Sequence, residues 1–240
     1  MDNLKLFTPQ HSISRVGRNN DGGYVICNLP GEYDLFISGG VSNDISFEQH
    51  FLNMYPNLKC YAFDGTVESL PVNDNRITFI KKNLGKDETL NTTNLKTYMD
   101  GFKNIFMKID IEGHEFRLFP ELPAYMSSIK QLVLEIHSPG DITLHPTYFK
   151  GLHDIDHEFM FNMFAMINKT HTLVHVHANN GCATHVYDGV LLPNVFECTF
   201  IRNDFVTEKI LNTTPLPKSI DMKNIPHKPD YSINYYPFVN

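Results

Sequence analysis

A dense group of ionisable residues follows an apolar run in residues 104–116, "NIFMKIDIEGHEF". The apolar run predicts a buried strand, and Asp110, Glu112, His114 and Glu115 come directly after it around a single glycine. Carboxylates and imidazoles are the groups that proteins use to transfer protons and to bind divalent cations. The segment therefore predicts a chemically active site at the end of a core strand.

A second strand end carries matching chemistry. The run "KQLVLEIH" predicts a strand over residues 130–137 that ends on His137. The carboxyl ends of parallel strands lie on one edge of a sheet, so Asp110 and His137 should meet there. Together they could form a general base for a hydroxyl, or bind a hard metal such as magnesium or manganese. Glu112 is the third catalytic candidate.

Structural roles compete for several of these groups. Glu112 and Glu115 also suit the positive N-terminal end of a short helix that should begin near His114. Glu135 lies inside an apolar strand, where a carboxylate needs a backbone or basic partner. We therefore expect Glu135 to be buried and paired, and His114 to lie at the start of the helix.

A glycine pair after the first strand predicts a nucleoside site. Gly39 and Gly40 permit a tight turn and a close backbone approach, and a helix begins just beyond them. Asp64 ends the next strand, about 20 residues past the glycines, where an acidic residue commonly binds ribose hydroxyls. The full GxGxxG pattern is absent, so the diphosphate of a dinucleotide has no evident cradle. A nucleoside without a diphosphate, such as S-adenosylmethionine, fits better.

These residues need a sheet to position them. Apolar strands alternate with amphipathic helices along the chain, which predicts an α/β fold with a largely parallel central sheet and helices on both faces. The last two strands have no helix between them, so the final strand should run antiparallel. The predicted strands cover residues 33–38, 58–64, 76–82, 104–110, 130–137, 171–178 and 194–202, and the predicted helices cover residues 43–55, 114–122 and 152–168.

The flanking segments suggest a cap and a tail around one main domain. The turn Asp21-Gly22-Gly23 predicts a small hairpin within an N-terminal cap at residues 1–32. The main domain then covers residues 33–204. The Pro- and Asn-rich residues 205–240 should form an extended tail packed on that domain.

Composition excludes several classes of protein. The 240 residues are 42% hydrophobic, which is enough for a real core, and the net charge is −7 with no long basic block. A nucleic-acid groove needs clustered Lys and Arg, so we expect no nucleic-acid partner. No apolar run approaches the ~18 residues of a membrane span, and the N-terminus lacks a signal-peptide pattern. These features, with four scattered cysteines, predict a soluble cytoplasmic protein with reduced thiols.

Several segments together resemble the FkbM-type family of S-adenosylmethionine-dependent methyltransferases. They are "DGGYVI", "DLFISGGVSNDISFE", "CYAFDGT", "MKIDIEGHEF" and "QLVLEIH", and the later "HANN" and "PNVFECTFIRND" are similar to a eukaryotic and viral branch. The resemblance implies a Rossmann-like class I methyltransferase fold. It also implies O-methylation, often of sugars or natural-product hydroxyls.

The resemblance also implies roles for individual residues. The glycine-rich loop of the family is reduced here to "SGGVSN", so the contacts of residues 41–43 stay open. Asp110 counts as a cofactor-binding residue as well as a catalytic one. The other implied cofactor contacts are Gly39, Gly40 and Ser42 around the methionine part with Asp44 near it, Asp64 at the ribose, and Asn83 and Leu84 at the adenine.

The histidine-rich strand near the C-terminus leaves other functions open. His175 and His177 share one strand face, and with a carboxylate they could serve a metal-dependent hydrolase or oxygenase. Alternatively, this strand end binds a small-molecule or glycan acceptor, covered by a hairpin lid that follows it. A non-catalytic binding module on the same fold is a third possibility. The predicted acceptor-binding residues are His177, Asn179, Asn180, His185 and Tyr187.

Overall fold

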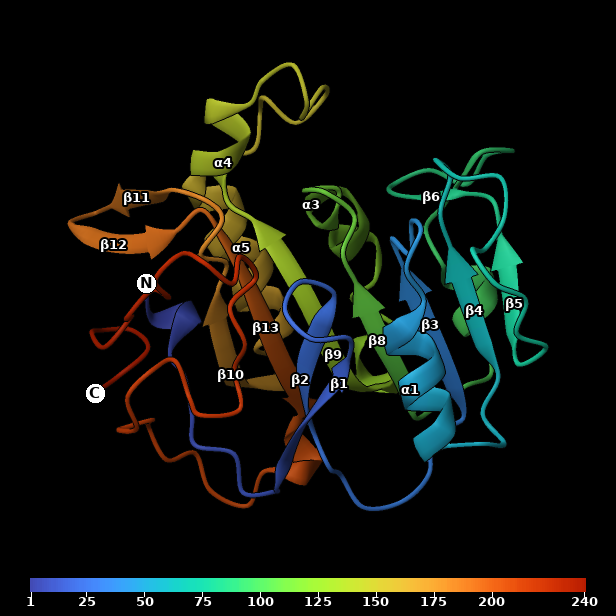
Figure 1. The fold of residues 1–240 in the computed structure, drawn as a ribbon, viewed down its shortest axis with the longest axis horizontal. Helices are drawn as coiled ribbons and strands as arrows, with labels where there is room; N and C mark the ends of the chain where they lie inside the picture. The colour runs from blue at the N-terminus through green and yellow to red at the C-terminus, as the bar shows by residue number, and fades with distance from the viewer.

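A seven-stranded sheet forms the centre of the computed structural model, which describes residues 1–240 (Figure 1). The strand order is β10-β13-β9-β8-β3-β4-β5. Only β13 runs against its neighbours, because it pairs antiparallel with both β9 and β10. This confirms the predicted parallel sheet with an antiparallel last strand. The strands are β3 (Leu35–Gly39), β4 (Cys60–Phe63), β5 (Ile77–Ile80), β8 (Ile105–Ile109), β9 (Ile129–His137), β10 (His171–Ala178) and β13 (Val195–Arg202).

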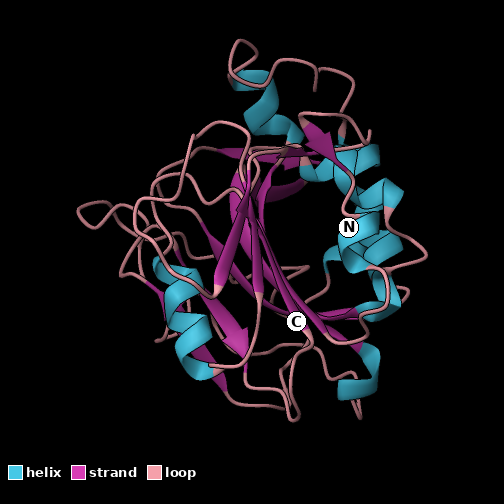
Figure 2. Ribbon diagram, turned by 90° about the vertical axis from the view of Figure 1, so that its right-hand side faces the viewer, coloured by secondary structure: helices cyan, strands magenta, loops and turns pink.

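The strands are apolar without alternation because both faces of the sheet are buried. Leu35 and Ile37 of β3 belong to one hydrophobic cluster, whereas Phe36 between them belongs to another. Figure 2 shows helices on both sides of the sheet. A strand covered on both faces is fixed in position, and that holds the ends of β3, β8 and β9 in register.

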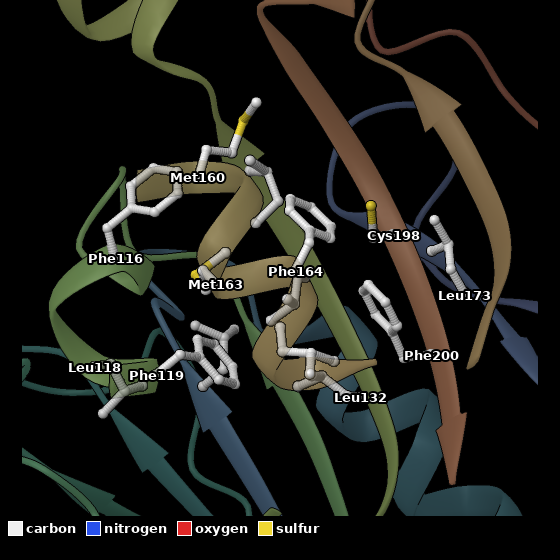
Figure 3. Packing of buried hydrophobic residues seen from close by; sticks show 14 of the residues in the cluster. Phe116, Leu118, Phe119, Leu132, Met160, Met163, Phe164, Leu173, Cys198 and Phe200 are labelled. Carbon is white, nitrogen blue, oxygen red and sulfur yellow. The ribbon is translucent and has the colours of Figure 1, made fainter. Parts of the chain in front are cut away.

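The larger cluster, of 39 buried residues, lies between the sheet and the helices α3 (Glu115–Leu118) and α5 (His157–Ile167). Phe164 of α5 packs against Phe196 and Phe200 of β13, and Figure 3 shows Met163 of the same helix pointing toward Phe119. Truncating a large side chain in such a core typically costs about 2–5 kcal/mol. The apolar side of α3 is therefore held firmly in this core. Its polar residues His114 and Arg117 lie at a cavity on the sheet edge.

An aromatic cluster fills the other face, beneath the helix α1 (Ser46–Met54) and a hairpin of β1 (Ile13–Gly17) and β2 (Gly23–Cys27). The rings of Phe51 and Phe106 stack with centroids 4.0 Å apart. The hairpin is the one that the Asp-Gly-Gly turn predicts. It carries Tyr24 over the sheet toward the end of β8.

Helix boundaries differ from the sequence prediction around β9 and α5. A short helix that was not predicted, α4 (Pro139–Leu144), follows β9, since proline fits the first turn of a helix. The predicted helix over residues 152–168 begins later, because the carboxylate of Asp156 accepts a hydrogen bond from the N–H of Phe159 and caps α5.

The remaining elements are short. A second hairpin projects beyond the sheet edge beside α4 (Figure 1), and the chain after residue 205 has no further helix or strand. The longest helix has 11 residues, and none of the helices could cross a membrane. The short elements are β6 (Asn83–Leu84), β7 (Thr92–Thr93), α2 (Lys96–Met99), β11 (Thr184–Tyr187), β12 (Val190–Pro193) and the 3-10 turns Asp2–Leu4, Phe119–Glu121, Met126–Ser128 and Asn203–Phe205.

Candidate active site

A cavity of about 910 Å³ opens at the carboxyl edge of the parallel strands. One end is bordered by the residues after β3, β4 and β5, and the other by the residues after β8 and on α3. Its size falls within the range of small-molecule sites, roughly 300–1,000 Å³. The residues that line it are Gly40, Ser42, Phe63, Asp64, Thr66, Lys82, Asn83, Leu84, Gly85, Lys86, Asp87, Thr89, Thr92, Asp110, Ile111, Glu112, His114, Arg117 and Tyr148.

The turn after β3 can only be made by glycine. Gly40 has a φ of +77°, and a Cβ on it would stand 1.6 Å from the backbone oxygen of Asp110. Gly39 does not line the cavity, but a Cβ on it would stand 2.4 Å from a methyl group of Leu84. The glycines thus bring the ends of β3 and β8 together and keep the floor of the cavity free of side chains.

Asp64 organises the end of the cavity that lies beyond β3 and β4. One carboxylate oxygen accepts a hydrogen bond from the N–H of Ser42 at 2.8 Å. The other accepts from the N–H and the hydroxyl of Thr66 at 2.7 and 2.6 Å. Each carboxylate oxygen has about two lone-pair sites, so the oxygen bonded to Ser42 can still accept from a ligand hydroxyl, whereas the oxygen bonded to Thr66 is saturated.

The other predicted cofactor residues divide into two groups. Asn83 and Leu84 line the cavity beyond β5, together with Ser42. Asp44 does not line it: its carboxylate accepts hydrogen bonds from the N–H and hydroxyl of Ser46 and pairs with Arg18 of the first hairpin. Asp44 therefore fastens the hairpin to the start of α1.

Asp110 lies at the centre of the polar wall. Its Oδ2 accepts a hydrogen bond from the hydroxyl of Tyr24 at 2.7 Å and lies 3.8 Å from the ammonium of Lys108. Lys108 is buried within β8 and also donates to the carbonyl of Gly40. A tyrosine and a lysine thus fix one carboxylate oxygen of Asp110, and the residue itself lines the cavity.

His137 ends β9 within a ring of carboxylates. Its Nδ1 is 2.9 Å from Oδ2 of Asp141, and its Nε2 is 3.1 Å from Oε2 of Glu112 and 3.8 Å from Oε2 of Glu135. Burial alone would lower the pKa of His137, but the hydrogen bond with Asp141 and the nearby carboxylates of Glu135 and Glu112 outweigh it and raise the pKa well above its ordinary value. Asp110 and His137 therefore meet at the sheet edge, as their positions predict.

Burial changes the acidity of the neighbouring carboxyl groups. It raises the pKa of Glu135 to about 8, helped by the nearby charge of Asp110 and opposed by His137. It raises the pKa of Glu112 as well, again against His137. Glu115 is fully buried, its pKa rises to about 7, and one oxygen accepts from the N–H of Ile111. As expected, Glu115 begins α3, whereas Glu112 turns toward the cavity.

None of the five predicted acceptor-binding residues lines this cavity. His177 lies between Glu197 and Asp230, and Asn180 bonds the backbone of residues 225–229 in the C-terminal segment. Asn179 donates a hydrogen bond to Glu135 at 3.3 Å, so it contacts a residue next to the site without lining the cavity. His185 and Tyr187 line a separate hollow of about 280 Å³ beside α4.

The two histidines of the alternative metal site have separate partners. His175 Nε2 lies 2.8 Å from Asp221, and His177 Nε2 lies 3.2 Å from Asp230. Neither histidine belongs to a group of three or more potential ligands, whereas Asp110, Glu135 and His137 form one such group. The structure thus gives the hydrolase or oxygenase alternative no common metal position.

Three site residues escaped the sequence analysis. Lys108 had a readable signal, since a lysine inside a core strand must find a partner. Tyr24 and Asp141 had none, because the first reaches Asp110 from 86 residues away and the second lies on a helix that was not predicted.

Comparison with known proteins finds only distant structural likeness. No family model and no curated protein sequence matches the chain. Among solved structures, the plantazolicin methyltransferase BpumL, in complex with a triazolic desmethylPZN analog and SAH, is similar over 72% of this chain and 78% of that chain, with 7% identity and a TM-score of 0.44. A putative methyltransferase of Streptococcus mutans, SMU.1697c in complex with SAH, is similar over 71% and 88%, with 10% identity and a TM-score of 0.32. The precorrin-6y C5,15-methyltransferase of Geobacter metallireducens is similar over 72% and 82%, with 11% identity and a TM-score of 0.32.

These TM-scores lie below 0.5, so the fold class rests on the sheet itself. Seven strands in the order β10-β13-β9-β8-β3-β4-β5, with β13 alone reversed and helices on both faces, define a Rossmann-like class I methyltransferase fold. Within that fold, the described cavity occupies the edge where open α/β sheets bind their ligands.

Proposed function

We propose that this chain is an S-adenosylmethionine-dependent O-methyltransferase that acts on a hydroxyl of a sugar or glycan. One observation carries the proposal: a single cavity joins the nucleoside-type end at Gly40 and Asp64 to the acid–base end at Asp110 and Glu112. Methyl transfer needs these two ends side by side, because the donor and the acceptor must be aligned for in-line displacement.

The nucleoside end fits the cofactor. Its backbone approaches closely at Gly40, where any Cβ would collide with the end of β8. Asp64 offers an acceptor position for a ribose hydroxyl, and Asn83 and Leu84 offer a polar and an apolar group for adenine. No dinucleotide fingerprint is needed, since S-adenosylmethionine has no diphosphate.

When bound, the cofactor supplies an electrophilic methyl group. The chain then has to align the acceptor hydroxyl and remove its proton. Glu112 is suited to the second task, because its side chain is 50% exposed, it lines the cavity, and burial raises its pKa. A carboxylate with a raised pKa is a stronger base than an ordinary glutamate.

His137 then acts as the partner of Glu112. Its Nε2 lies 3.1 Å from Glu112, and Asp141 holds the other ring nitrogen. His137 therefore orients Glu112.

The rim of the cavity and the family resemblance support the proposed acceptor class. Tyr148 lines the cavity, and 64% of its surface is exposed. An exposed aromatic ring offers an apolar face and a hydroxyl to a ring-shaped acceptor. FkbM-type methyltransferases, which the chain resembles, mostly methylate sugar or natural-product hydroxyls.

The test is calorimetric titration of the whole chain with S-adenosylmethionine and S-adenosylhomocysteine. We expect both to bind, and Asp64→Asn to weaken both by at least about tenfold, since a charged acceptor is lost. Asp188→Asn is the matched control, because Asp188 lies on the exposed turn of the second hairpin. If neither nucleoside binds the folded chain, the proposal fails.

A further inference from the structure

Three ligand-type side chains converge beside the cavity from two neighbouring strands. Ile109 of β8 pairs with Leu134 of β9, so the next residues, Asp110 and Glu135, stand side by side. His137 follows Glu135 by two positions and therefore shares its face of the sheet. One ligand atom from each of these three residues lies within 4.8 Å of the others.

Each of the three side chains is held by another residue, as is usual for metal ligands. The shortest of these contacts is the 2.7 Å hydrogen bond from the hydroxyl of Tyr24 to Asp110, and the longest is the 3.3 Å hydrogen bond from the side-chain amide of Asn179 to Glu135. The pairs are Asp110 with Tyr24, Glu135 with Asn179, and His137 with Asp141.

His137 leaves one nitrogen without a partner. The residue is 9% exposed, and its Nε2 is buried and makes no hydrogen bond, although carboxylates lie 3.1 and 3.8 Å away. When the Nδ1 proton is donated to Asp141, the lone pair of Nε2 points among the carboxylates of Glu112 and Glu135. That arrangement is the carboxylate–histidine pair that commonly supports a bound metal.

The charge balance also favours a cation here. The carboxylates of Asp110, Glu112 and Glu135 gather around Nε2, and Asp141 stands on the other side of the ring. The nearest permanent cation is Lys108, 3.8 Å from Asp110. Buried carboxylates are paired or bind metals, because an isolated charge loses much of its hydration energy.

We propose that Asp110, Glu135 and His137 form a binding site for a divalent cation of the Mn²⁺ class. Two carboxylates and one imidazole suit Mn²⁺ better than Mg²⁺, which favours an all-oxygen set. Asp110 lines the cavity, so a cation held by these three residues would be within reach of an acceptor in the cavity. The catalytic role of the cation rests on the proposed function: the cation would bind the acceptor oxygen and lower the pKa of the acceptor hydroxyl. The hydroxyl proton passes to Glu112, the oxygen forms its bond to the methyl carbon, and the sulfur–methyl bond breaks with its electrons on sulfur.

Binding of the cation is tested without turnover. The chelator-treated whole chain is titrated with Mn²⁺ alone, and free Mn²⁺ is followed by electron paramagnetic resonance, with Mg²⁺ as a competitor. We expect a saturable site, with about one Mn²⁺ per chain and weaker competition by Mg²⁺. Glu135→Gln and His137→Gln should each weaken Mn²⁺ binding at least about tenfold.

Two further kinds of variant control for folding. Asp141→Asn keeps all three ligands and should weaken binding by about tenfold, because it removes only the support of His137. Glu158→Gln and His227→Gln change the same residue types at exposed positions and should bind Mn²⁺ like the unaltered chain. Far-ultraviolet circular dichroism and melting curves establish that each variant is folded.

Outcomes separate this proposal from the proposed function. A folded chain that binds S-adenosylhomocysteine but shows no saturable Mn²⁺ binding up to millimolar concentration would overturn the cation site alone. Unchanged Mn²⁺ affinity in folded Glu135→Gln and His137→Gln would overturn it too. Mn²⁺ binding without nucleoside binding would support the cation site and count against methyl transfer.

Discussion

Two clusters of histidine and carboxylates lie on β9 and β10, the two strands that flank β13, and have different surroundings. His137 on β9 sits among Glu112, Glu135 and Asp141, next to the cavity. On β10, His177 sits between Glu197 and Asp230.

A row of ionisable groups connects the two clusters across the sheet. Glu135 pairs in register with Glu197, and Glu197 pairs with His177. At the β10 end, Asn224 and Asp230 of the C-terminal segment cover the row. At the β9 end, Asp110 and Glu112 open onto the cavity. The same residue types therefore form a candidate site at His137, where the cluster is open to the cavity. At His177, where the C-terminal segment covers the cluster, they stabilise the fold.

The largest difference between the clusters should appear in turnover. Asp110→Asn removes a charge from the open cluster, and we expect methyl transfer to fall about 10³-fold, because a ligand or base at the reacting centre is lost. The melting temperature should change little. Radiolabelled methyl transfer to a glycan acceptor measures the effect. A decrease of less than tenfold would contradict the role of Asp110.

The covered cluster should respond in stability instead. Asp230→Asn leaves His177 buried with one fewer anionic partner, and breaking a buried ion pair costs about 3 kcal/mol. Chemical denaturation should show this loss. Turnover per folded chain should stay within about twofold, and a larger decrease would mean that the covered cluster also serves the reaction.

The stability of the covered cluster around His177 should also depend on pH. Burial opposes protonation of His177, but Asp230 and Glu197 raise its pKa to about 10. Since the unfolded value is about 6.5, this stabilisation is complete below pH 6.5 and is lost as the pH rises toward 10. Hydrogen exchange in residues 221–231, corrected for intrinsic rates, should therefore speed up between pH 7 and 9.5. Asp230→Asn should flatten that dependence.

The smallest effect should come from the support of the open cluster. Tyr24→Phe removes one hydrogen bond to Asp110, worth roughly 1–2 kcal/mol, so turnover should fall about tenfold. Because Tyr24 acts through Asp110, the pH profile of turnover should shift while nucleoside binding stays similar. A tenfold loss with an unshifted profile would point to a packing defect.

Much of the fold and half of the site could be predicted because the signals are local. The apolar runs indicate the strands, and the placement of Asp110 and His137 at two parallel strand ends puts them together. Asp64 and the glycine pair likewise border the cavity. In each of these cases, the sequence pattern and the sheet edge are enough to position the residue.

The rest depends on contacts between distant parts of the chain. The pattern of β10 suggested that His177 and Asn180 bind an acceptor, yet both contact the C-terminal segment, whose path has no periodic signal. Asp141 reaches His137 only because Pro139 begins an unexpected helix. Tyr24 reaches Asp110 only because the first hairpin folds across the sheet.

The reversed strand also has a consequence for biosynthesis. Since β13 lies between β9 and β10, β10 has no neighbour in the sheet until β13 has been synthesised. A nascent chain that has reached β10 carries an apolar strand with unpaired backbone groups, which is a hazard for aggregation. Assembly of this half of the sheet therefore waits for residues 195–202, although Asp110 and His137 leave the ribosome much earlier.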